Sequence, residues 1–290
     1  MTNYDLKYFF TEHFCPVFDN AHDKATLIRV EDHLVDAINT EKFNDNQIVY
    51  IALEGSQNYK LDTNASDVDT KLILLPNIYD IIWNHKPIST THVRENGEHT
   101  SYTDLRNFFQ SLRKQNVNFI ETLYSPWVIV NKLYVDEISY LLKNKDLISH
   151  YNRVKAVKTI GGIATDRYKA IWNMNSARAN IIKEYGYDGK SVSHLLRLYY
   201  FLNNYIEEKP YEECIVPKKE CREDILFLKN NKMSSNIVES FATYLNHEIQ
   251  KMVDNYVNSH QEEIDQDAER VLTEVQERII RKSLKMDLIY

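Results

Sequence analysis

Two aspartates separated by a single residue are the side chains best placed to do chemistry in this sequence. They close the stretch "GSQNYKLDTNASDVD" (residues 55–69), where Asp67 and Asp69 stand just before an apolar run. Because side chains alternate along a strand, both carboxylates project from the same face, with backbones about 7 Å apart. Carboxylate oxygens in this arrangement suit one or two Mg²⁺ ions, or Mn²⁺, that hold a substrate's phosphates. The spacing therefore predicts a metal site.

Gly55 and Ser56 open the same stretch, at the end of the preceding apolar run. A glycine lets the backbone approach a ligand closely, and the serine hydroxyl and nearby amides can bond phosphate oxygens. Each piece is ambiguous alone. An Asp-x-Asp pair can be a solvated strand end, and Gly-Ser after a strand can be a plain turn.

The residues around this stretch predict how it is positioned. Residues 24–42 carry an apolar stripe at helical spacing, and residues 47–53 and 68–76 are short β-branched runs typical of strands. Asn96-Gly97, between two Thr-, Val- and Tyr-containing stretches, favours a type I′ hairpin turn. Residues 103–115 are expected to form a helix with Thr103 as its N-cap. The first half therefore mixes strands and helices.

The second half is expected to be helical. Strand patterns nearly vanish after about residue 150, and periodic segments cover 166–184, 190–207 and 234–258. The expected stripe of the last segment comprises Ile237, Phe241, Tyr244, Leu245, Met252 and Tyr256. We expect an α+β fold, in which a mixed sheet flanked by helices forms a catalytic domain (1–147). A helical domain (148–290) completes the cleft.

Composition limits the possible partners. The 290-residue chain has a formal net charge of −7 and a pI near 5.8, so contact with a polyanion requires a local basic patch. Its three cysteines lack metal-type spacing. The N-terminal residues do not resemble a secretory signal, and no apolar run reaches membrane-spanning length. We therefore expect a cytoplasmic protein without a membrane partner; the oligomeric state is not readable.

A second pattern lies in "KSVSHLLR". Lys190, His194 and Arg197 are spaced i, i+4 and i+7, which places all three on one helical face. A cationic stripe that faces the cleft could hold a triphosphate or an acceptor phosphate. The alternative is a solvated helix edge with an ordinary core histidine.

Taken together, the order helix, strand, Gly-Ser, loop, Asp-x-Asp, strand resembles the signature of the DNA-polymerase-β-like nucleotidyltransferase superfamily. A closer resemblance is to the bacterial and phage family that includes RNA-ligase-associated polymerase-like proteins of RNA repair. Three stretches carry it: "GSQNYKLDTNASDVD", "SYTDLRNFFQSLRKQNVNFIETLYSP" and "YGYDGKSVSHLLRL". The resemblance spans roughly residues 48–230. Lys60 and Val117 depart from it, since the family usually has glycine and proline there.

The resemblance implies a third carboxylate from a neighbouring strand, beside Asp67 and Asp69. Glu98 is the candidate, because it precedes "TSY" where the family tends to carry an acid. Glu95 and Asp104 are alternatives. Glu98 could instead be an exposed residue beside the hairpin turn. The predicted catalytic and metal-binding set is thus Asp67, Asp69 and Glu98. The predicted nucleotide-binding set is Gly55, Ser56, Tyr59, Lys190, His194 and Arg197. Glu121 matches a family position, but a structural bond to an arginine explains it equally well.

The superfamily resemblance also implies a reaction. An acceptor hydroxyl would attack the α-phosphate of a nucleoside triphosphate (NTP), and pyrophosphate would leave. The leading hypothesis is transfer of a nucleoside monophosphate to an RNA 3′ end in RNA repair. Two alternatives stay open: the acceptor is a protein side chain or a small molecule, or the chain is a catalytically inactive nucleotide-binding module. No pattern in the sequence specifies the preferred nucleobase.

Overall fold

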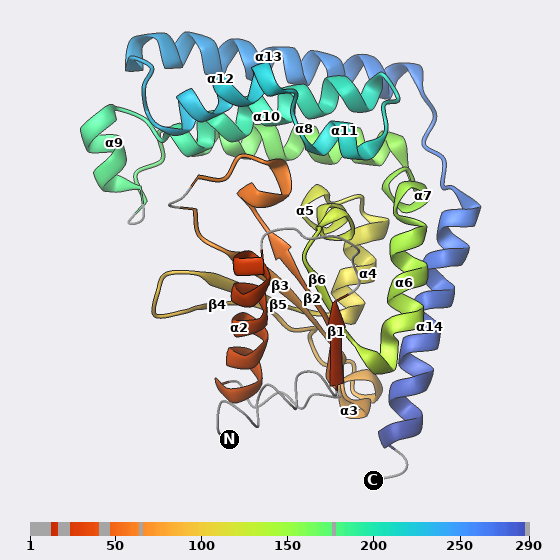
Figure 1. Ribbon diagram of the computed structural model, residues 1–290. Coiled ribbons are helices and arrows are strands. Elements are labelled where there is room, and N and C mark those ends of the chain that lie inside the picture. Colours follow the sequence, from red (N-terminus) through yellow and green to blue (C-terminus); the bar gives the residue numbers. More distant parts are fainter. Residues whose placement is uncertain (1–12, 17–23, 41–46, 64–65, 176–177, 288–290) are drawn as a thin grey trace.

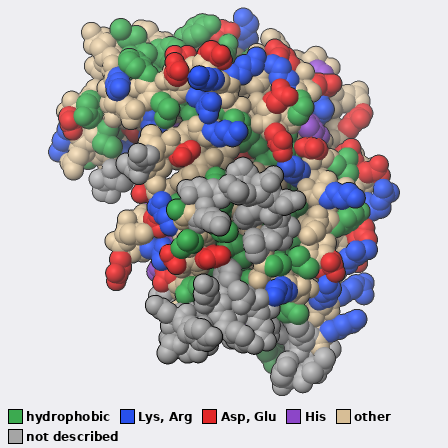
Figure 2. Space-filling model, viewed as in Figure 1, with side chains coloured by type: hydrophobic (Ala, Val, Ile, Leu, Met, Phe, Trp, Pro, Cys, Tyr) green, Lys and Arg blue, Asp and Glu red, His purple; other side chains and the backbone are tan. Residues whose placement is uncertain are grey.

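A mixed sheet and a layer of long helices make up the protein (Figure 1). The computed structural model describes residues 13–16, 24–40, 47–63, 66–175 and 178–287. The sheet lies in the first half of the chain, and the second half is helical, so the expected α+β class is confirmed. In Figure 2, acidic and basic side chains are interspersed over the described part of one face of the molecule.

Six strands form the sheet in the order β1-β6-β2-β3-β5-β4. Their bounds are β1 (Phe14–Pro16), β2 (Ile48–Glu54), β3 (Asp69–Leu74), β4 (Ser89–Val93), β5 (His99–Asp104) and β6 (Val128–Asn131). Only the β3–β5 pair is parallel among these described strands; the others are antiparallel. The two strands expected on either side of the Gly-Ser loop are thus β2 and β3, which pair directly.

One face of the sheet packs against helix α2 (Lys24–Thr40), and the opposite face packs against the helical layer. Helix α2 covers the first face, where Val30 and Leu34 pack with Ile51 and Leu72 in one buried cluster. The expected helix over 24–42 is therefore confirmed as far as residue 40. The opposite face carries Tyr50 and the alternate residues of β3, and it turns toward the helical layer.

The β4–β5 hairpin is confirmed, but its turn differs from the expected type. Gly97 alone has a positive φ in the turn, at 87°, and its N–H bonds the carbonyl oxygen of Arg94. A type I′ turn would also need Asn96 in the left-handed region. The loop is longer instead, and the Asn96 side chain bonds the N–H and the carboxylate of Glu98.

Short helices stand before and after the hairpin. These are α3 (Ile78–Ile82), which precedes β4, and α4 (Leu105–Arg113), α5 (Val117–Ile120) and η3 (Glu121–Tyr124), which follow β5. Asp104, not Thr103, is the N-cap of α4, since its carboxylate accepts from the Arg106 N–H at 2.7 Å. The strand simply continues one residue further than the pattern predicted.

The helical layer begins at α8. Its helices are α8 (Arg153–Ala170), α9 (Ala179–Tyr185), α10 (Gly189–Ile206), α11 (Tyr211–Ile215), α12 (Lys219–Lys229) and α13 (Ser235–Ser259). The expected helix over 166–184 was wrong, because α8 ends at Ala170 and α9 begins at Ala179. In α13 the buried stripe includes Val238 and Ala242, whereas Ile237 and Tyr244 are exposed. Residues 245 and 256 were predicted correctly.

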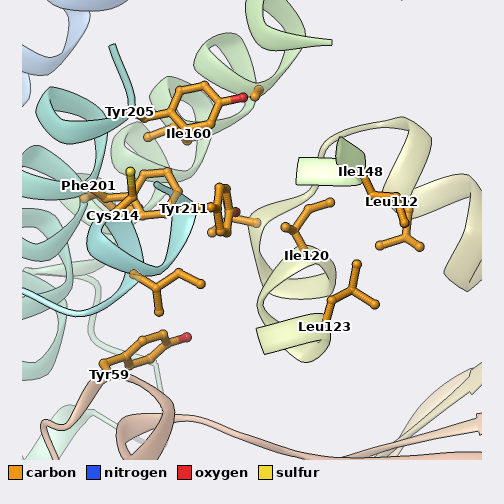
Figure 3. Close-up of a cluster of buried hydrophobic side chains, with 14 of the residues drawn as sticks. Tyr59, Leu112, Ile120, Leu123, Ile148, Ile160, Phe201, Tyr205, Tyr211 and Cys214 are labelled. Atoms are coloured by element: carbon orange, nitrogen blue, oxygen red, sulfur yellow. The ribbon is translucent and has the colours of Figure 1, made fainter. Parts of the chain in front are cut away.

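One buried cluster joins the sheet's second face to the helical layer (Figure 3). It runs from Tyr59 and Ile120 to Phe201 and Tyr211. The last helix, α14 (Gln266–Asp287), returns to pack against α6 (Val135–Lys143) and α7 (Lys145–Ser149). Residues on both sides of position 147 thus share a core, and the division there stays a prediction.

Candidate functional site

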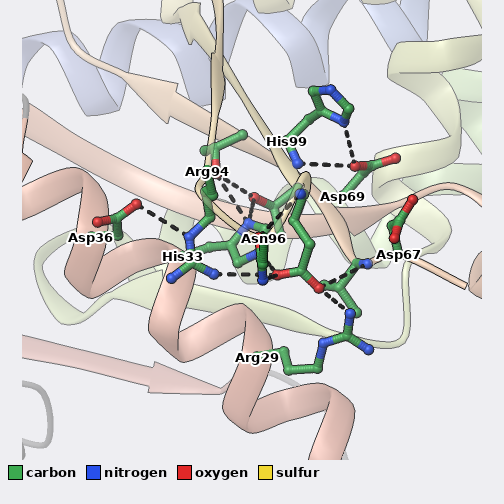
Figure 4. Close-up of polar contacts among 12 residues, drawn as sticks. Arg29, His33, Asp36, Asp67, Asp69, Arg94, Asn96 and His99 are labelled. Atoms are coloured by element: carbon green, nitrogen blue, oxygen red, sulfur yellow. Dashed lines mark hydrogen bonds and ion pairs between the residues drawn. The ribbon is translucent and has the colours of Figure 1, made fainter. Parts of the chain in front are cut away.

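Asp69 begins β3, and Asp67 precedes it by two residues (Figure 4). Val68 between them is fully buried on the α2 side, which leaves the two carboxylates on the other side. The Asp67 side chain is exposed, and that of Asp69 is 39% exposed. The expected pair of same-sided carboxylates is therefore present.

Gly55 adopts a backbone conformation that only glycine reaches easily. Its φ and ψ are 96° and −152°. This conformation turns the chain from β2 directly into the short helix η2 (Ser56–Tyr59), and a Cβ added at Gly55 would lie 3.9 Å from Oδ2 of Asp69. The following loop is closed by the Leu61 N–H, which bonds the Ser56 carbonyl at 2.9 Å.

A cavity of about 310 Å³ collects nearly all of the predicted residues. We call it the cationic cavity, and it is lined by Gly55, Ser56, Tyr59, Leu61, Thr63, Ser66, Asp67, Asp69, Lys190, Ser193, His194, Arg197, Ile225 and Lys229. Of the nine predicted site residues, only Glu98 is not part of this lining. The structure thus brings the Asp-x-Asp strand and the α10 stripe to opposite walls of one space.

Lys229, which the sequence did not single out, enters the cavity from the end of α12. Gly189 permits this, because a Cβ on Gly189 would lie 2.3 Å from the Leu228 carbonyl oxygen. The Gly189 N–H also bonds Asn231 at 2.8 Å, so the start of α10 and the end of α12 are fastened together. Burial and the neighbouring Lys190 lower the pKa of Lys229. No local pattern marks Lys229, since only tertiary packing brings it to the site.

Positive charge is concentrated around His194. Burial lowers the pKa of His194 well below its usual value, and four nearby cations lower it further: Arg197, Arg167, Lys190 and Lys229. The Nε atom of Arg197 is buried and has no hydrogen-bond partner within the described residues. Packing several cations around a neutral imidazole costs electrostatic energy, which a polyanionic ligand would offset.

Arg197 is also held by the sheet half of the molecule. Its Nη1 bonds Glu121 Oε1 at 3.0 Å, and its guanidinium lies 3.8 Å from the centroid of the Tyr59 ring. The Tyr59 hydroxyl donates to the other oxygen of Glu121. Glu121 therefore has the structural bond to an arginine that the sequence left as one interpretation. Since the Arg197 guanidinium covers one face of the Tyr59 ring, that face is not open for a nucleobase to stack on.

Glu98 lies on the other side of the sheet. Its side chain is 3% exposed and is bonded by Arg29, by His33 at 2.9 Å and by Arg94 at 3.3 Å, all on the α2 side. Burial alone would raise the pKa of Glu98, but hydrogen bonds from His33, Asn96, Arg29 and the Val68 N–H outweigh it and lower the pKa to about 2. The structure does not bring Glu98 to the cationic cavity.

The two alternative carboxylates are not at the cavity either. Asp104 caps α4 and pairs with Arg106 at 2.7 Å, and Glu95 lies exposed in the hairpin turn. The β5 side chain beside Asp69 is His99, whose Nδ1 lies 3.1 Å from Asp69 Oδ1. On the other flank, β2 places Glu54 directly opposite Asp69. The neighbours of Asp69 are thus an imidazole and a carboxylate.

The two aspartates can supply some of the ligands of a magnesium ion. Among the described residues no three His, Cys, Asp or Glu side chains are grouped as metal ligands. Mg²⁺ in phosphate-transfer sites is held by one or two carboxylates, and water and substrate phosphates complete its shell. Asp67 and Asp69 supply that number of hard ligands at the mouth of a cationic cavity.

The fold and this arrangement define a class. A mixed sheet that presents Gly-Ser after one strand and Asp-x-Asp on the next, opposite a helical layer, is that of a DNA-polymerase-β-like nucleotidyltransferase. The chain belongs to the RNA repair pathway DNA polymerase beta family, whose model matches residues 28–281. No curated protein matches the chain. No helix in the described ranges is long and apolar enough to cross a membrane.

Proposed function

We propose that the protein transfers a nucleoside monophosphate from an NTP to the 3′-hydroxyl of an RNA. The reaction uses two Mg²⁺ or Mn²⁺ ions, which Asp67 and Asp69 bind. The observation that carries this proposal is the cationic cavity, in which the Asp-x-Asp pair faces Lys190, Arg197 and Lys229 across one space. The family's association with RNA repair supports an RNA acceptor.

The reaction balances without a further reactant. The acceptor oxygen forms a bond to the α-phosphorus, the bond from that phosphorus to the β-phosphate oxygen breaks, and pyrophosphate leaves with the electron pair. The hydroxyl proton passes to solvent. When bound, the metal supplies positive charge beside the attacking and leaving oxygens.

The protein's own residues bind and orient the triphosphate. Lys190 and Lys229 lie where they can donate to the β- and γ-phosphates, and the Gly55–Ser56 turn presents its amides and hydroxyl at the opposite wall. Arg197 is fixed by Glu121, so its remaining N–H groups are pre-oriented. Groups fixed before the substrate arrives need little reorganisation during transfer.

Transfer to a protein or a small molecule would use the same cavity, and net charge of −7 is compatible with either. An inactive module would bind NTP without releasing pyrophosphate. The exposed, same-sided Asp67 and Asp69 favour catalysis over the module.

The test is incubation with Mg²⁺ or Mn²⁺ and each of four α-³²P-labelled NTPs, with small RNAs and separately with a cell lysate. We expect label in RNA, and none with the Asp67→Asn/Asp69→Asn variant. Asp254→Asn, which changes an exposed acid of α13 outside the cavity lining, is the control. Label only in protein would overturn the RNA acceptor, and no label at all would overturn the transferase.

A further inference from the structure

A second cavity lies on the other side of Asp69. It measures about 490 Å³ and is lined by Glu54, Gly55, Asn58, Tyr59, Asp69, Lys71, Ser89, Thr90, Thr91, His99, Ser101, Tyr102, Thr103, Asn118, Phe119, Glu121 and Thr122. We call it the hydroxyl cavity, because many of these side chains are alcohols. It shares Gly55, Tyr59 and Asp69 with the cationic cavity. Asp69 therefore stands between two spaces of different chemistry.

The two cavities divide the roles that in-line transfer requires. The attacking oxygen and the leaving pyrophosphate must lie on opposite sides of the α-phosphorus. If the triphosphate occupies the cationic cavity, the attacking hydroxyl comes from the side of Asp69 where the hydroxyl cavity opens. Its volume lies in the range of pockets that enclose a small molecule or one monomer unit. A flat protein surface would not fill it.

A partly buried ion pair lines the hydroxyl cavity. Lys71 is 6% exposed and Glu54 is 21% exposed, and the Lys71 ammonium bonds Oε1 of Glu54. Lys71 also donates to the Asn118 carbonyl at 3.2 Å and lies 4.2 Å from the centroid of the Phe119 ring. The ammonium is therefore engaged by two hydrogen bonds and one aromatic ring of the protein. It holds Glu54 in place and offers little to a phosphate.

Glu54 keeps one oxygen for a ligand. Within the described residues, Oε1 accepts from Lys71 and no group bonds Oε2. The register places Glu54 directly opposite Asp69 on the same sheet face, with Ser101 next to Lys71 one row deeper. A hydrogen-bond acceptor thus lies one strand away from the carboxylate that faces the α-phosphate. That geometry suits a ligand with two adjacent hydroxyls, one of which attacks while its neighbour donates to Glu54.

We propose that the hydroxyl cavity is the acceptor site and takes the terminal ribonucleoside of an RNA 3′ end, with Glu54 accepting from its 2′-hydroxyl. This proposal rests on the proposed function. A ribose presents adjacent 2′- and 3′-hydroxyls, whereas a serine, threonine or tyrosine acceptor presents one. The 2′-hydroxyl is the group by which proteins distinguish RNA from DNA. The half-buried Phe119 ring supplies an apolar surface for the base.

The test compares two RNA tetranucleotides that differ only at the last sugar, one a ribose and one a 2′-deoxyribose. Binding is measured by fluorescence anisotropy with a non-hydrolysable NTP and Mg²⁺, and α-³²P transfer is measured in parallel. We expect the ribose form to bind several-fold and up to about tenfold more tightly, the effect of one hydrogen bond. In Glu54→Gln, Lys71 orients the amide oxygen toward itself, so the NH₂ faces the cavity and the preference disappears.

A second variant keeps the ion pair intact. Ser101→Val adds bulk to the lining of the hydroxyl cavity on a strand that favours β-branched residues, and it should weaken binding of both oligonucleotides without changing NTP affinity. As the matched control, Lys190→Ala in the cationic cavity should weaken NTP binding and keep the preference for ribose.

The outcomes separate this proposal from the proposed function. Equal binding and transfer to both oligonucleotides, or a preference that survives Glu54→Gln, would overturn the acceptor site while transfer itself stands. Absence of label in either oligonucleotide and in lysate with wild-type protein would overturn the function on which the acceptor site depends.

Discussion

The backbone N–H of Val68, the residue between the two aspartates, donates to Oε1 of Glu98 at 3.2 Å. Glu98 is at the same time bonded by Arg29 and His33 of α2. A carboxylate on one face of the sheet therefore fixes the strand segment whose carboxylates act on the other face. Glu98 positions Asp67 and Asp69 through the backbone, a role different from the metal ligand that the sequence predicted.

Replacing Glu98 should therefore change stability in a pH-dependent way. Its pKa is lowered from 4.5 to about 2, so its contribution is present above about pH 4.5 and is lost as the pH falls toward 2. The shift corresponds to about 3 kcal/mol. We expect Glu98→Gln to lower the free energy of unfolding by about that amount at pH 7 and by much less at pH 2.5, measured by urea denaturation. Glu95→Gln, three residues earlier and exposed, should change neither value; a pH-independent gap for Glu98→Gln would contradict the assignment.

Asp67→Asn and Asp69→Asn should each abolish most transfer without loss of folding. Asp67 is exposed and Asp69 is 39% exposed, and in Asp69→Asn the amide oxygen can still accept from the His99 N–H. Loss of one electrostatic group at a reacting centre costs about 3 kcal/mol, or roughly a hundredfold in kcat. We expect Mn²⁺ binding, followed by electron paramagnetic resonance, to weaken in parallel. Unchanged Mn²⁺ affinity in both variants would show that the metal is held elsewhere.

NTP binding should be accompanied by proton uptake at His194. In the free protein, burial and four cations hold the pKa of His194 well below its usual value. A bound triphosphate brings negative charge beside the imidazole, and this raises the pKa. We expect calorimetry near pH 6 in buffers of different ionisation enthalpy to show uptake that His194→Gln removes. His92→Gln, outside both cavity linings, should leave it unchanged; identical uptake in His194→Gln would contradict the prediction.

Much of this site could be predicted from the sequence, because its parts are local. The alternation of β3 puts Asp67 and Asp69 on one face, and the i, i+4, i+7 spacing of α10 puts Lys190, His194 and Arg197 on another. The wrong prediction concerns Glu98, whose place depends on pairing between strands that are distant in the sequence. The face to which Glu98 points is set by the β3–β5 register, and no pattern in residues 94–104 encodes that register.

The same limit explains the residues that were not identified. Lys229 reaches the cavity only because Gly189 lets α10 meet α12. Glu54 and Lys71 are ordinary strand residues until β2 and β3 align them. Lys60 stands where the resemblance implies glycine, and it lies in the left-handed region at φ 55°, a conformation that glycine adopts without strain.

Arg197 and Glu121 should behave as a coupled pair that ties the helical layer to the sheet. Their side chains are 7% and 5% exposed. Removing one partner of a buried pair leaves the other charge unpaired and costs about 3–5 kcal/mol. We expect Arg197→Met and Glu121→Gln each to lower the unfolding free energy by that order, and the double variant to lose less than the sum. The exposed pair Arg153–Glu208 is the control, where Arg153→Met should cost under about 1 kcal/mol. Additive losses at Arg197 and Glu121 would contradict the coupling.

Val117→Pro should stabilise the protein, although it replaces a buried residue. Val117 is the first residue of α5, where proline is favoured because the N–H has no partner within the helix. The preceding Asn116 has φ −73° and ψ 113°, a conformation that tolerates a following proline. We expect a gain of about 0.4–1 kcal/mol in thermal or urea unfolding, since proline restricts the unfolded chain. The same substitution one residue later is the control: the Asn118 N–H bonds the Asn116 side chain at 3.1 Å, so Asn118→Pro should destabilise. A loss with Val117→Pro would show that burial of the valine methyl groups outweighs the helix-start geometry.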